Sequence, residues 1–387
     1  MVRLLIFIVY FSFISLGLPD SLLGSAWPLM HVELGANNEF AGIVAFTVSV
    51  CTVIASLFSS QLIQRLGTGK VTLLSVLSTV IGVTGYSLAG NVWFLIPSAV
   101  FLGIGAGAVD TALSNYVALH FAAKHMSWLH CFWGIGAMSG TYIMAGFLGM
   151  GEWRWGFRAV GAVLAIIVVT LIFSQKLWYI YEKEPAKAEE EEKIVTNSDA
   201  IKLKDVTKYM MAMFCNNGYE TTIGVWMATY FISVKDMKIE VAAAYCSMLY
   251  LGITLGRVVS GALAEKVSDK QFIRFGTILA IGGVAVIILP LPQIFAAAGL
   301  FIVGFGAAPV FPSILHLTPE KYGERNSATV IGLEMSAAYV GAACMPGITG
   351  FIFGKLGMSF IPVVVLVLFV VMLVATESAN KSSGISI

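Results

Sequence analysis

The chain has little charge for its length. Only 12% of its 387 residues are Asp, Glu, Lys or Arg, about half the share found in a soluble globular protein, whereas 58% are hydrophobic. The formal net charge of +1 leaves no broad basic or acidic surface for a nucleic acid or another polyion. The composition therefore disfavours both a water-soluble protein and a nucleic-acid partner.

The five cysteines show no pairing pattern. They stand singly in apolar stretches, which is typical of small buried side chains rather than of disulfides or metal ligands. A nucleophile elbow, a phosphate-binding loop and a metal-ligand spacing are also missing from the sequence. The apolar N-terminal segment lacks a signal-peptide cleavage pattern, so we interpret it as a membrane helix. We expect no enzymatic activity, no cofactor and no metal.

Long apolar runs dominate the chain. A helix that crosses a membrane needs about 20 mostly apolar residues, and twelve such runs are separated by turns or charges. They lie near residues 4–30, 39–63, 70–90, 92–120, 126–150, 155–181, 207–233, 240–264, 271–290, 292–317, 326–354 and 356–376. The sequence therefore predicts an all-α membrane protein with twelve transmembrane helices.

One long polar segment interrupts these runs. Residues 182–206 contain several lysines and the acidic run Glu189 to Glu192, which predicts a linker (182–206) between an N-terminal six-helix half (1–181) and a C-terminal six-helix half (207–387). Of the 23 lysines and arginines, 17 lie at the termini, in the linker or in loops on the same side. By the positive-inside rule, both termini and the linker are expected in the cytoplasm, and the chain in a bacterial inner membrane.

The two halves resemble each other at a constant offset of 200 or 201 residues. Residues 20–24 match residues 220–224, and Gly105 and Asn115 match Gly306 and His316. Such an offset indicates two pseudo-symmetric halves related by an axis along the membrane normal. We expect the substrate to be held between them near the midplane.

Two matched loops resemble a known signature. The segments Ser60-x-x-x-Gln64-Arg65-Leu66-Gly67-Thr68-Gly69-Lys70 and Gly261-x-x-x-Glu265-Lys266-Val267-Ser268-Asp269-Lys270 are similar to the loop motif G-x-x-x-D-R-x-G-R-K of the major facilitator superfamily. The first copy has Gln64 where the family has an acidic residue. This resemblance implies the major facilitator fold.

Four carboxylates lie inside predicted spans: Asp20, Asp110, Glu220 and Glu334. Each costs about 2.5–3.5 kcal/mol at a helix centre, and we expect no lysine or arginine at matching depth to neutralise them. Such residues carry protons, bind substrate or stabilise a broken helix, as Asp20 could do beside Pro19. We predict Asp110, Asp20 and Glu334 as the proton-coupling residues.

Amides, aromatic rings and histidines surround these acids in the sequence. Carboxylates and amides hydrogen-bond to vicinal hydroxyls, and indole faces stack on the C–H face of a sugar ring. An isolated aromatic side chain or histidine in a span can instead be part of the packed interior. The predicted substrate-binding residues are Asn115, Tyr116, His130, Trp133, Asn217, Glu220, Trp226, His316 and Glu334.

A narrower resemblance involves spans 4, 7 and 10. Gly103-x-Gly105…Asp110-Thr111…Asn115, Gly218-x-Glu220-x-x-x-Gly224-x-Trp226 and Gly304-x-Gly306-x-x-Pro309-x-x-Pro312 are similar to the proton-coupled fucose, galactose and glucose symporters. The resemblance implies that acids in spans 1 and 4 act in sugar binding and proton translocation, and these match Asp20 and Asp110. Glu334 stands where that family often has Gln, and this additional acid leaves a cationic or amino-bearing substrate as an alternative to a neutral sugar.

The leading prediction is proton-coupled uptake of a monosaccharide or a similar small polar solute by alternating access. Its partners are then the sugar-like substrate, protons and membrane lipids, and we expect a monomer. The alternative is a proton-coupled exporter of drugs or amphipathic metabolites, which the additional acid Glu334 would suit. A non-transporting sensor is disfavoured because the linker is too short for a signalling domain.

Overall fold

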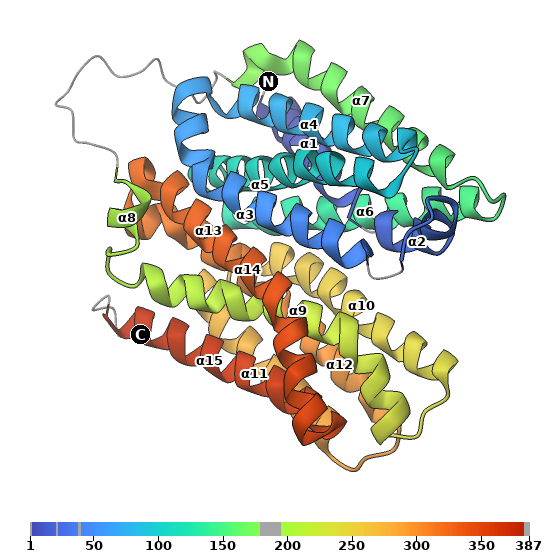
Figure 1. The fold of residues 1–387 in the computed structure, drawn as a ribbon. Coiled ribbons are helices and arrows are strands. Elements are labelled where there is room, and N and C mark those ends of the chain that lie inside the picture. The colour runs from blue at the N-terminus through green and yellow to red at the C-terminus, as the bar shows by residue number, and fades with distance from the viewer. Residues whose placement is uncertain (1, 21, 38–39, 179–194, 383–387) are drawn as a thin grey trace. The chain divides into compact units, whose positions relative to one another are not determined.

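The computed structural model describes residues 2–20, 22–37, 40–178 and 195–382 of the chain. These residues form helices joined by short turns, and no strand occurs among them (Figure 1). The α-helices are α1 (Val2–Gly17), α2 (Leu22–Glu33), α3 (Phe40–Leu66), α4 (Thr68–Leu88), α5 (Leu95–His120), α6 (Ala123–Leu148), α7 (Trp153–Trp178), α8 (Asn197–Ala200), α9 (Val206–Val234), α10 (Ile239–Leu263), α11 (Asp269–Ile288), α12 (Ile294–Ala307), α13 (Val310–Tyr322), α14 (Glu324–Leu356) and α15 (Ile361–Ser382). Two 3₁₀ turns, η1 (Val92–Phe94) and η2 (Met358–Phe360), precede α5 and α15.

These helices build the twelve predicted spans. In the described part of the chain, 11 helical segments are long and apolar enough to cross a membrane. The twelfth is α9, which has 29 residues but carries Asn216, Asn217 and Glu220 in its middle. The all-α, twelve-span prediction is confirmed.

Two spans are broken by a turn that contains proline. The first consists of α1 and α2, with Pro19 and Asp20 between them, and the tenth consists of α12 and α13, with Pro309 in the turn. Proline has no backbone N–H and its ring clashes with the preceding helical turn, so a helix tends to end there. The first break places Asp20 outside regular helix.

Contacts divide the chain into two compact units. The N-terminal unit comprises Met1–His120, Leu129–Val195 and Arg325–Gly332, and the C-terminal unit comprises Phe121–Trp128, Thr196–Glu324 and Leu333–Ile387. In the N-terminal unit α5 packs against α3 and α4, and α4 packs against α7 (Figure 1). In the C-terminal unit α12 packs against α10 and α11, and α11 packs against α15. The helices thus pair in the same order in both units.

Close helix contacts repeat at the same sequence offset. A Cβ atom added to Gly105 would lie 2.7 Å from the carbonyl oxygen of Ser75, and one added to Gly306 would lie 2.6 Å from that of Gly276. Both distances are too short for a side chain, so each position requires glycine for the close approach of two helices. Because each member of the first contact lies 201 positions before its counterpart, the internal repeat predicted from the sequence is confirmed in the contacts.

The end of α2 is tied to the start of α7. Glu33 accepts hydrogen bonds from the Arg154 guanidinium and, at 2.5 Å, from the indole N–H of Trp153. The Arg154 guanidinium also donates to the carbonyl oxygen of Ala89 at 2.8 Å. The hydrogen bonds from Arg154 and Trp153 hold the pKa of the Glu33 carboxyl below its ordinary value of 4.5.

The second signature loop has defined helix-capping geometry. Ser268 and Gln271 form a reciprocal capping box at the start of α11, which satisfies two backbone N–H groups. Glu265, at the acidic position of the motif, forms a 2.6 Å ion pair with Lys124, a residue of the same unit. The hydrogen bond from Lys124 lowers the pKa of the Glu265 carboxyl. Within the predicted linker, residues 182–194 lie outside the described part of the chain.

Candidate functional site

The break in the first span brings together two predicted site residues. Asp20 follows Pro19 in the turn between α1 and α2, and its Oδ2 accepts a 2.7 Å hydrogen bond from the Trp133 indole N–H of α6. Asp20 is exposed, and Trp133 is half-buried. One turn earlier on α6, the buried His130 makes an edge contact with Phe13 of α1, at 5.1 Å between ring centroids. One face of α6 therefore presents His130 and Trp133 to the first span.

A cavity of about 240 Å³ lies next to this pair inside the N-terminal unit. Residues of α1, the following turn, α2, α3, α4 and α5 line it. Most of the wall is apolar, and its polar side chains are Ser15, Asp20, Ser49, Thr79 and Tyr86. The cavity therefore combines one carboxylate with four hydroxyl groups.

Two other predicted residues of the N-terminal unit lie on α5 and are almost fully buried. Asp110 is 5% exposed, and its Oδ1 accepts a hydrogen bond from the Ser114 hydroxyl at 3.4 Å. Asn115 is 4% exposed, and its Oδ1 accepts a 2.7 Å hydrogen bond from Ser327, which belongs to the same unit. Both side chains thus have hydrogen-bond donors in the protein interior.

Tyr116 lies in a packed aromatic cluster. It is 1% exposed, its hydroxyl donates to the carbonyl oxygen of Trp178 at 3.3 Å, and its ring lies 5.2 Å from the Trp178 ring. His120 packs edge-on against the same tyrosine at 4.6 Å. The structure therefore places Tyr116 in the packing between α5 and α7, and its assignment as a substrate contact stays a prediction.

The polar residues of α9 form the first group in the C-terminal unit. The Asn216 amide donates to the Asn217 side-chain oxygen at 3.4 Å, and Glu220 lies one turn further along. Arg257 of α10, which is 9% exposed, interacts electrostatically with Glu220. This attraction comes from a different helix, and whether Arg257 lies at the depth of Glu220 in the membrane stays a prediction.

The indole N–H of Trp226 forms a hydrogen bond within the protein. The Nε1 group donates to the carbonyl oxygen of Pro346 in α14 at 2.7 Å, and the ring packs edge-on against Phe353 at 4.6 Å. With its N–H engaged, the indole offers only ring surface to a substrate.

Glu334 is fully buried in α14. One carboxylate oxygen accepts a 2.9 Å hydrogen bond from Thr318 of α13, and the other has no hydrogen-bond partner among the described residues. Lys321, one turn after Thr318, exerts an electrostatic attraction on this carboxylate. A second intramembrane acid is thus under the electrostatic influence of a cation, although the ion pair of Lys321 is with Asp205.

His316 is tied to the second signature loop. Its Nδ1 lies 2.7 Å from the carboxylate of Asp269, the first residue of α11. The histidine is therefore held at the junction of α13 with α11, and its role as a substrate contact also stays a prediction.

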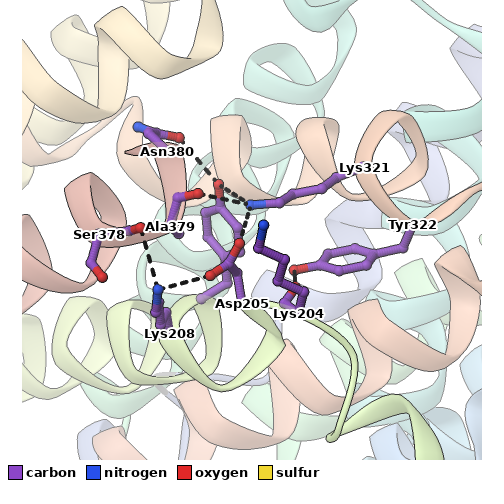
Figure 2. A network of polar contacts seen from close by, with 9 residues as sticks. Lys204, Asp205, Lys208, Lys321, Tyr322, Ser378, Ala379 and Asn380 are labelled. Carbon is purple, nitrogen blue, oxygen red and sulfur yellow. Dashed lines mark hydrogen bonds and ion pairs between the residues drawn. The ribbon is translucent and has the colours of Figure 1, made fainter. Parts of the chain in front are cut away.

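A polar network that the sequence analysis did not identify surrounds the start of α9. Asp205 has the left-handed backbone conformation, with φ of 71°, and only 2% of its side chain is exposed. Its carboxylate forms ion pairs with Lys208 at 2.8 Å and with Lys321 at 3.3 Å. The Lys321 ammonium also lies 4.6 Å from the centre of the Tyr209 ring. Figure 2 shows the carboxylate between the two lysines.

The same network joins the ends of three helices. Lys208 and Lys321 donate to the carbonyl oxygens of Ser378 and Ala379 in α15, at 3.3 and 3.4 Å (Figure 2). The Tyr322 hydroxyl donates to the carbonyl oxygen of Lys204 at 3.1 Å. The last residues of the predicted linker are therefore fixed to α13, and Lys208 and Lys321 connect α15 to the same network. The signal in the sequence was a group of three lysines around Asp205, which we interpreted as part of a solvated linker.

The comparisons with known proteins agree with this architecture. The family model described as Major Facilitator Superfamily matches residues 9–343. The Bacillus subtilis glucose/mannose transporter GlcP is 21% identical over 350 residues, covering 86% of this chain and 84% of the relative. The cis,cis-muconate transport protein of Acinetobacter baylyi is 23% identical over 375 residues, covering 91% and 89%. The outward-conformation structure of the transporter FucP superposes with a TM-score of 0.80 at 13% identity, covering 97% of this chain and 98% of FucP.

Proposed function

The chain belongs to the Major Facilitator Superfamily, and from this premise we propose that it takes up a monosaccharide or a similar small polar solute together with protons. Members of this family are multi-pass membrane transporters rather than enzymes. The proposal includes transport by alternating access, location in a bacterial inner membrane, a monomeric state and cytoplasmic termini. The position of the termini is supported by the positive-inside rule, because 17 of the 23 lysines and arginines lie on the predicted cytoplasmic side.

The pairing of Asp20 with Trp133 carries the proposal. A carboxylate can accept two hydrogen bonds from vicinal hydroxyls, and an indole ring offers an apolar face to the C–H side of a sugar. The 2.7 Å bond between the two side chains fixes their relative orientation, and both reach solvent-accessible surface. An acid and an aromatic ring held side by side in this way suit a small, neutral, hydroxylated solute.

The relatives support the same class of substrate. GlcP is a glucose/mannose transporter, and FucP is a fucose:proton symporter. We place the substrate contacts on Asn115, Tyr116, His130, Trp133, Asn217, Glu220, Trp226, His316 and Glu334. Of these, Trp133 has the strongest support because of its bond to Asp20.

We place the coupled proton on Asp110, with Asp20 and Glu334 as the other candidate carriers. Asp110 is 5% exposed, and its Oδ1 accepts a hydrogen bond from the Ser114 hydroxyl of the same helix. A buried carboxylate can accept a proton and release it when its surroundings change.

The test is uptake into proteoliposomes. Purified protein is reconstituted with an inward proton gradient and offered radiolabelled D-glucose, D-mannose, L-fucose, D-glucosamine and cis,cis-muconate in turn. We expect accumulation of one of the neutral sugars that collapses when an ionophore removes the gradient. Asp20→Asn should reduce this uptake at least about tenfold, whereas Asp199→Asn, on the exposed α8, should not. If no sugar accumulates, or if accumulation is the same with and without the proton gradient, the proposal is contradicted.

Export of an amphipathic metabolite is the second candidate function. The fully buried acid Glu334, which a neutral sugar does not require, favours it. In the same vesicles, extrusion of preloaded muconate or of a cationic dye, without sugar uptake, would establish this alternative. Accumulation of D-glucosamine alone would instead indicate that the additional acid selects an amino group.

A further inference from the structure

We propose that the cavity of the N-terminal unit holds a chain of water molecules through which protons reach Asp20, with the Tyr86 hydroxyl as a member of that chain. This inference rests on the proton coupling proposed above and specifies its route. It concerns α1 to α5 of one unit and names a residue, Tyr86, that neither the sequence motifs nor the comparisons single out.

The polar side chains of the cavity determine what it can hold. The hydroxyl protons of Ser15, Ser49 and Thr79 are already donated to backbone carbonyl oxygens of their own helices, at 2.6, 3.0 and 3.1 Å. These three hydroxyls therefore have acceptor capacity left for a molecule in the cavity that their residues line, as the Asp20 carboxylate does. A wall of acceptors that includes a carboxylate favours a hydrogen-bond donor such as water or a protonated water cluster, and disfavours an anion.

Tyr86 supplies the second, independent observation. It lines the cavity, is 2% exposed, and its hydroxyl has no hydrogen-bond partner in the described part of the chain. A buried hydroxyl without a partner is costly, and the rule for native proteins is that protein or ordered water satisfies it. Because Tyr86 is one of the residues that line the cavity, we expect the partner of its hydroxyl to be a water molecule of that cavity.

The cavity is large enough for such a chain. Each water molecule occupies about 30 Å³ in the liquid, so a volume of about 240 Å³ accommodates several of them. Apolar cavities stay dry, but a buried water is retained where two to four polar groups surround it. Five polar side chains on three helices and one turn meet that condition.

The positions of the lining residues give the route a direction. Tyr86 lies two residues before the end of α4, which is the outer end in the proposed topology, whereas Asp20 lies at the break of the first span. Ala106 lines the cavity on α5 four residues before Asp110, a rise of about 6 Å along the helix. The route therefore starts near the outer end of α4 and ends at Asp20, and the cavity wall at Ala106 lies about one helical turn from Asp110.

The proton transfer along the water chain conserves protons and needs no other reactant. Each water molecule gives one proton to its neighbour and receives one from the preceding molecule, and the Tyr86 hydroxyl does the same. The last transfer converts the Asp20 carboxylate into a carboxylic acid. Among the lining residues, Asp20 and Tyr86 are the two that can ionise, and Trp133 is the neutral donor that contacts Asp20 from α6.

X-ray radiolytic footprinting of the purified full-length chain tests the water chain directly. Radicals formed from ordered internal water modify the side chains that touch it, even when these are buried. We expect Tyr86 to be hydroxylated at least about fivefold faster than Tyr230, a tyrosine of α9 that is 3% exposed and lies outside the cavity. Equal rates for the two tyrosines would overturn the inference.

The variant Tyr86→Phe tests the role in proton access. It removes only the hydroxyl and keeps the edge contact with Phe157, at 5.4 Å between ring centroids. In vesicles loaded with a pH-sensitive dye, we expect proton uptake on addition of D-glucose to slow at least about fivefold, while D-glucose exchange at equal pH is unchanged. Tyr230→Phe is the matched control and should behave as wild type.

The two assays separate the possible failures. If wild-type vesicles show no proton uptake with D-glucose, the proposed function fails for this sugar, and footprinting alone then decides whether the cavity holds water. If wild-type vesicles do take up protons and Tyr86→Phe matches them, Tyr86 has no part in proton access and the inference is wrong.

Discussion

The ion pairs of Asp205 should contribute strongly to the stability of the C-terminal unit. Asp205→Asn removes the negative charge between Lys208 and Lys321 but keeps the size of the side chain. Asparagine tolerates a positive φ as well as aspartate does, so the backbone at φ of 71° is not strained by the change. The measured effect therefore reports the lost charge.

The magnitude follows from burial. Removing one partner of a buried ion pair costs about 3–5 kcal/mol, because the remaining charge lacks a counter-ion. Here the Asp205 side chain is 2% exposed, but the lysine side chains are 34% and 20% exposed, so water compensates part of the loss. We expect a destabilisation of about 2–3 kcal/mol.

Thermal unfolding in detergent, followed by circular dichroism at 222 nm, measures this effect. If the C-terminal unit unfolds as one body, the expected loss lowers its melting temperature by about 4–12 °C. Asp199→Asn is the matched control, since its ion pair with Lys202 is exposed on both sides, and it should leave the melting temperature unchanged. Equal melting temperatures for Asp205→Asn and wild type would refute the reasoning.

The remaining predictions concern coupling, binding, pH and topology. Asp110→Asn should keep substrate exchange at equal pH but lose uptake driven by a pH gradient, and undiminished driven uptake would remove Asp110 as the carrier. Trp133→Phe removes the donor to Asp20 and should weaken sugar binding about tenfold by isothermal titration, with the helical content unchanged. Because the folded-state pKa of Glu33 is depressed, its stabilising contribution is present above pH 4.5 and is lost below it, so the melting temperatures of wild type and Glu33→Gln should converge on acidification. A cysteine placed at Ser198 in a cysteine-free background should resist an impermeant reagent added to intact cells, and its labelling would contradict the proposed topology.

The repetitive part of the fold could be predicted from the sequence because it depends on local composition and on register. Apolar runs of sufficient length define the spans, and a glycine that permits close helix contact recurs wherever the contact recurs, as at Gly105 and Gly306. The broken first span could also be anticipated at Pro19, since proline disrupts a helix wherever it lies in the interior.

The polar contacts of the candidate site could not be predicted in the same way. Asp20 and Trp133 are 113 positions apart, and nothing in either segment specifies that the two helices meet at that level. The electrostatic partners of two acids could not be predicted for a related reason. Arg257 of α10 attracts Glu220 of α9, and Lys321 of α13 attracts Glu334 of α14, so each cation stands on a different helix from the acid.

The bond from Trp226 to the carbonyl oxygen of Pro346 makes this indole an optical reporter of α14. Gly350 supplies the space for it, because a Cβ atom there would lie 3.1 Å from the Trp226 ring. Any bending of α14 at Pro346 stretches this bond and changes the polarity around the indole, which shifts its emission maximum. In a chain that keeps Trp226 and the binding residue Trp133 and has the other six tryptophans replaced by phenylalanine, a shift in emission would therefore record the movement of this helix during a transport cycle, without an attached dye.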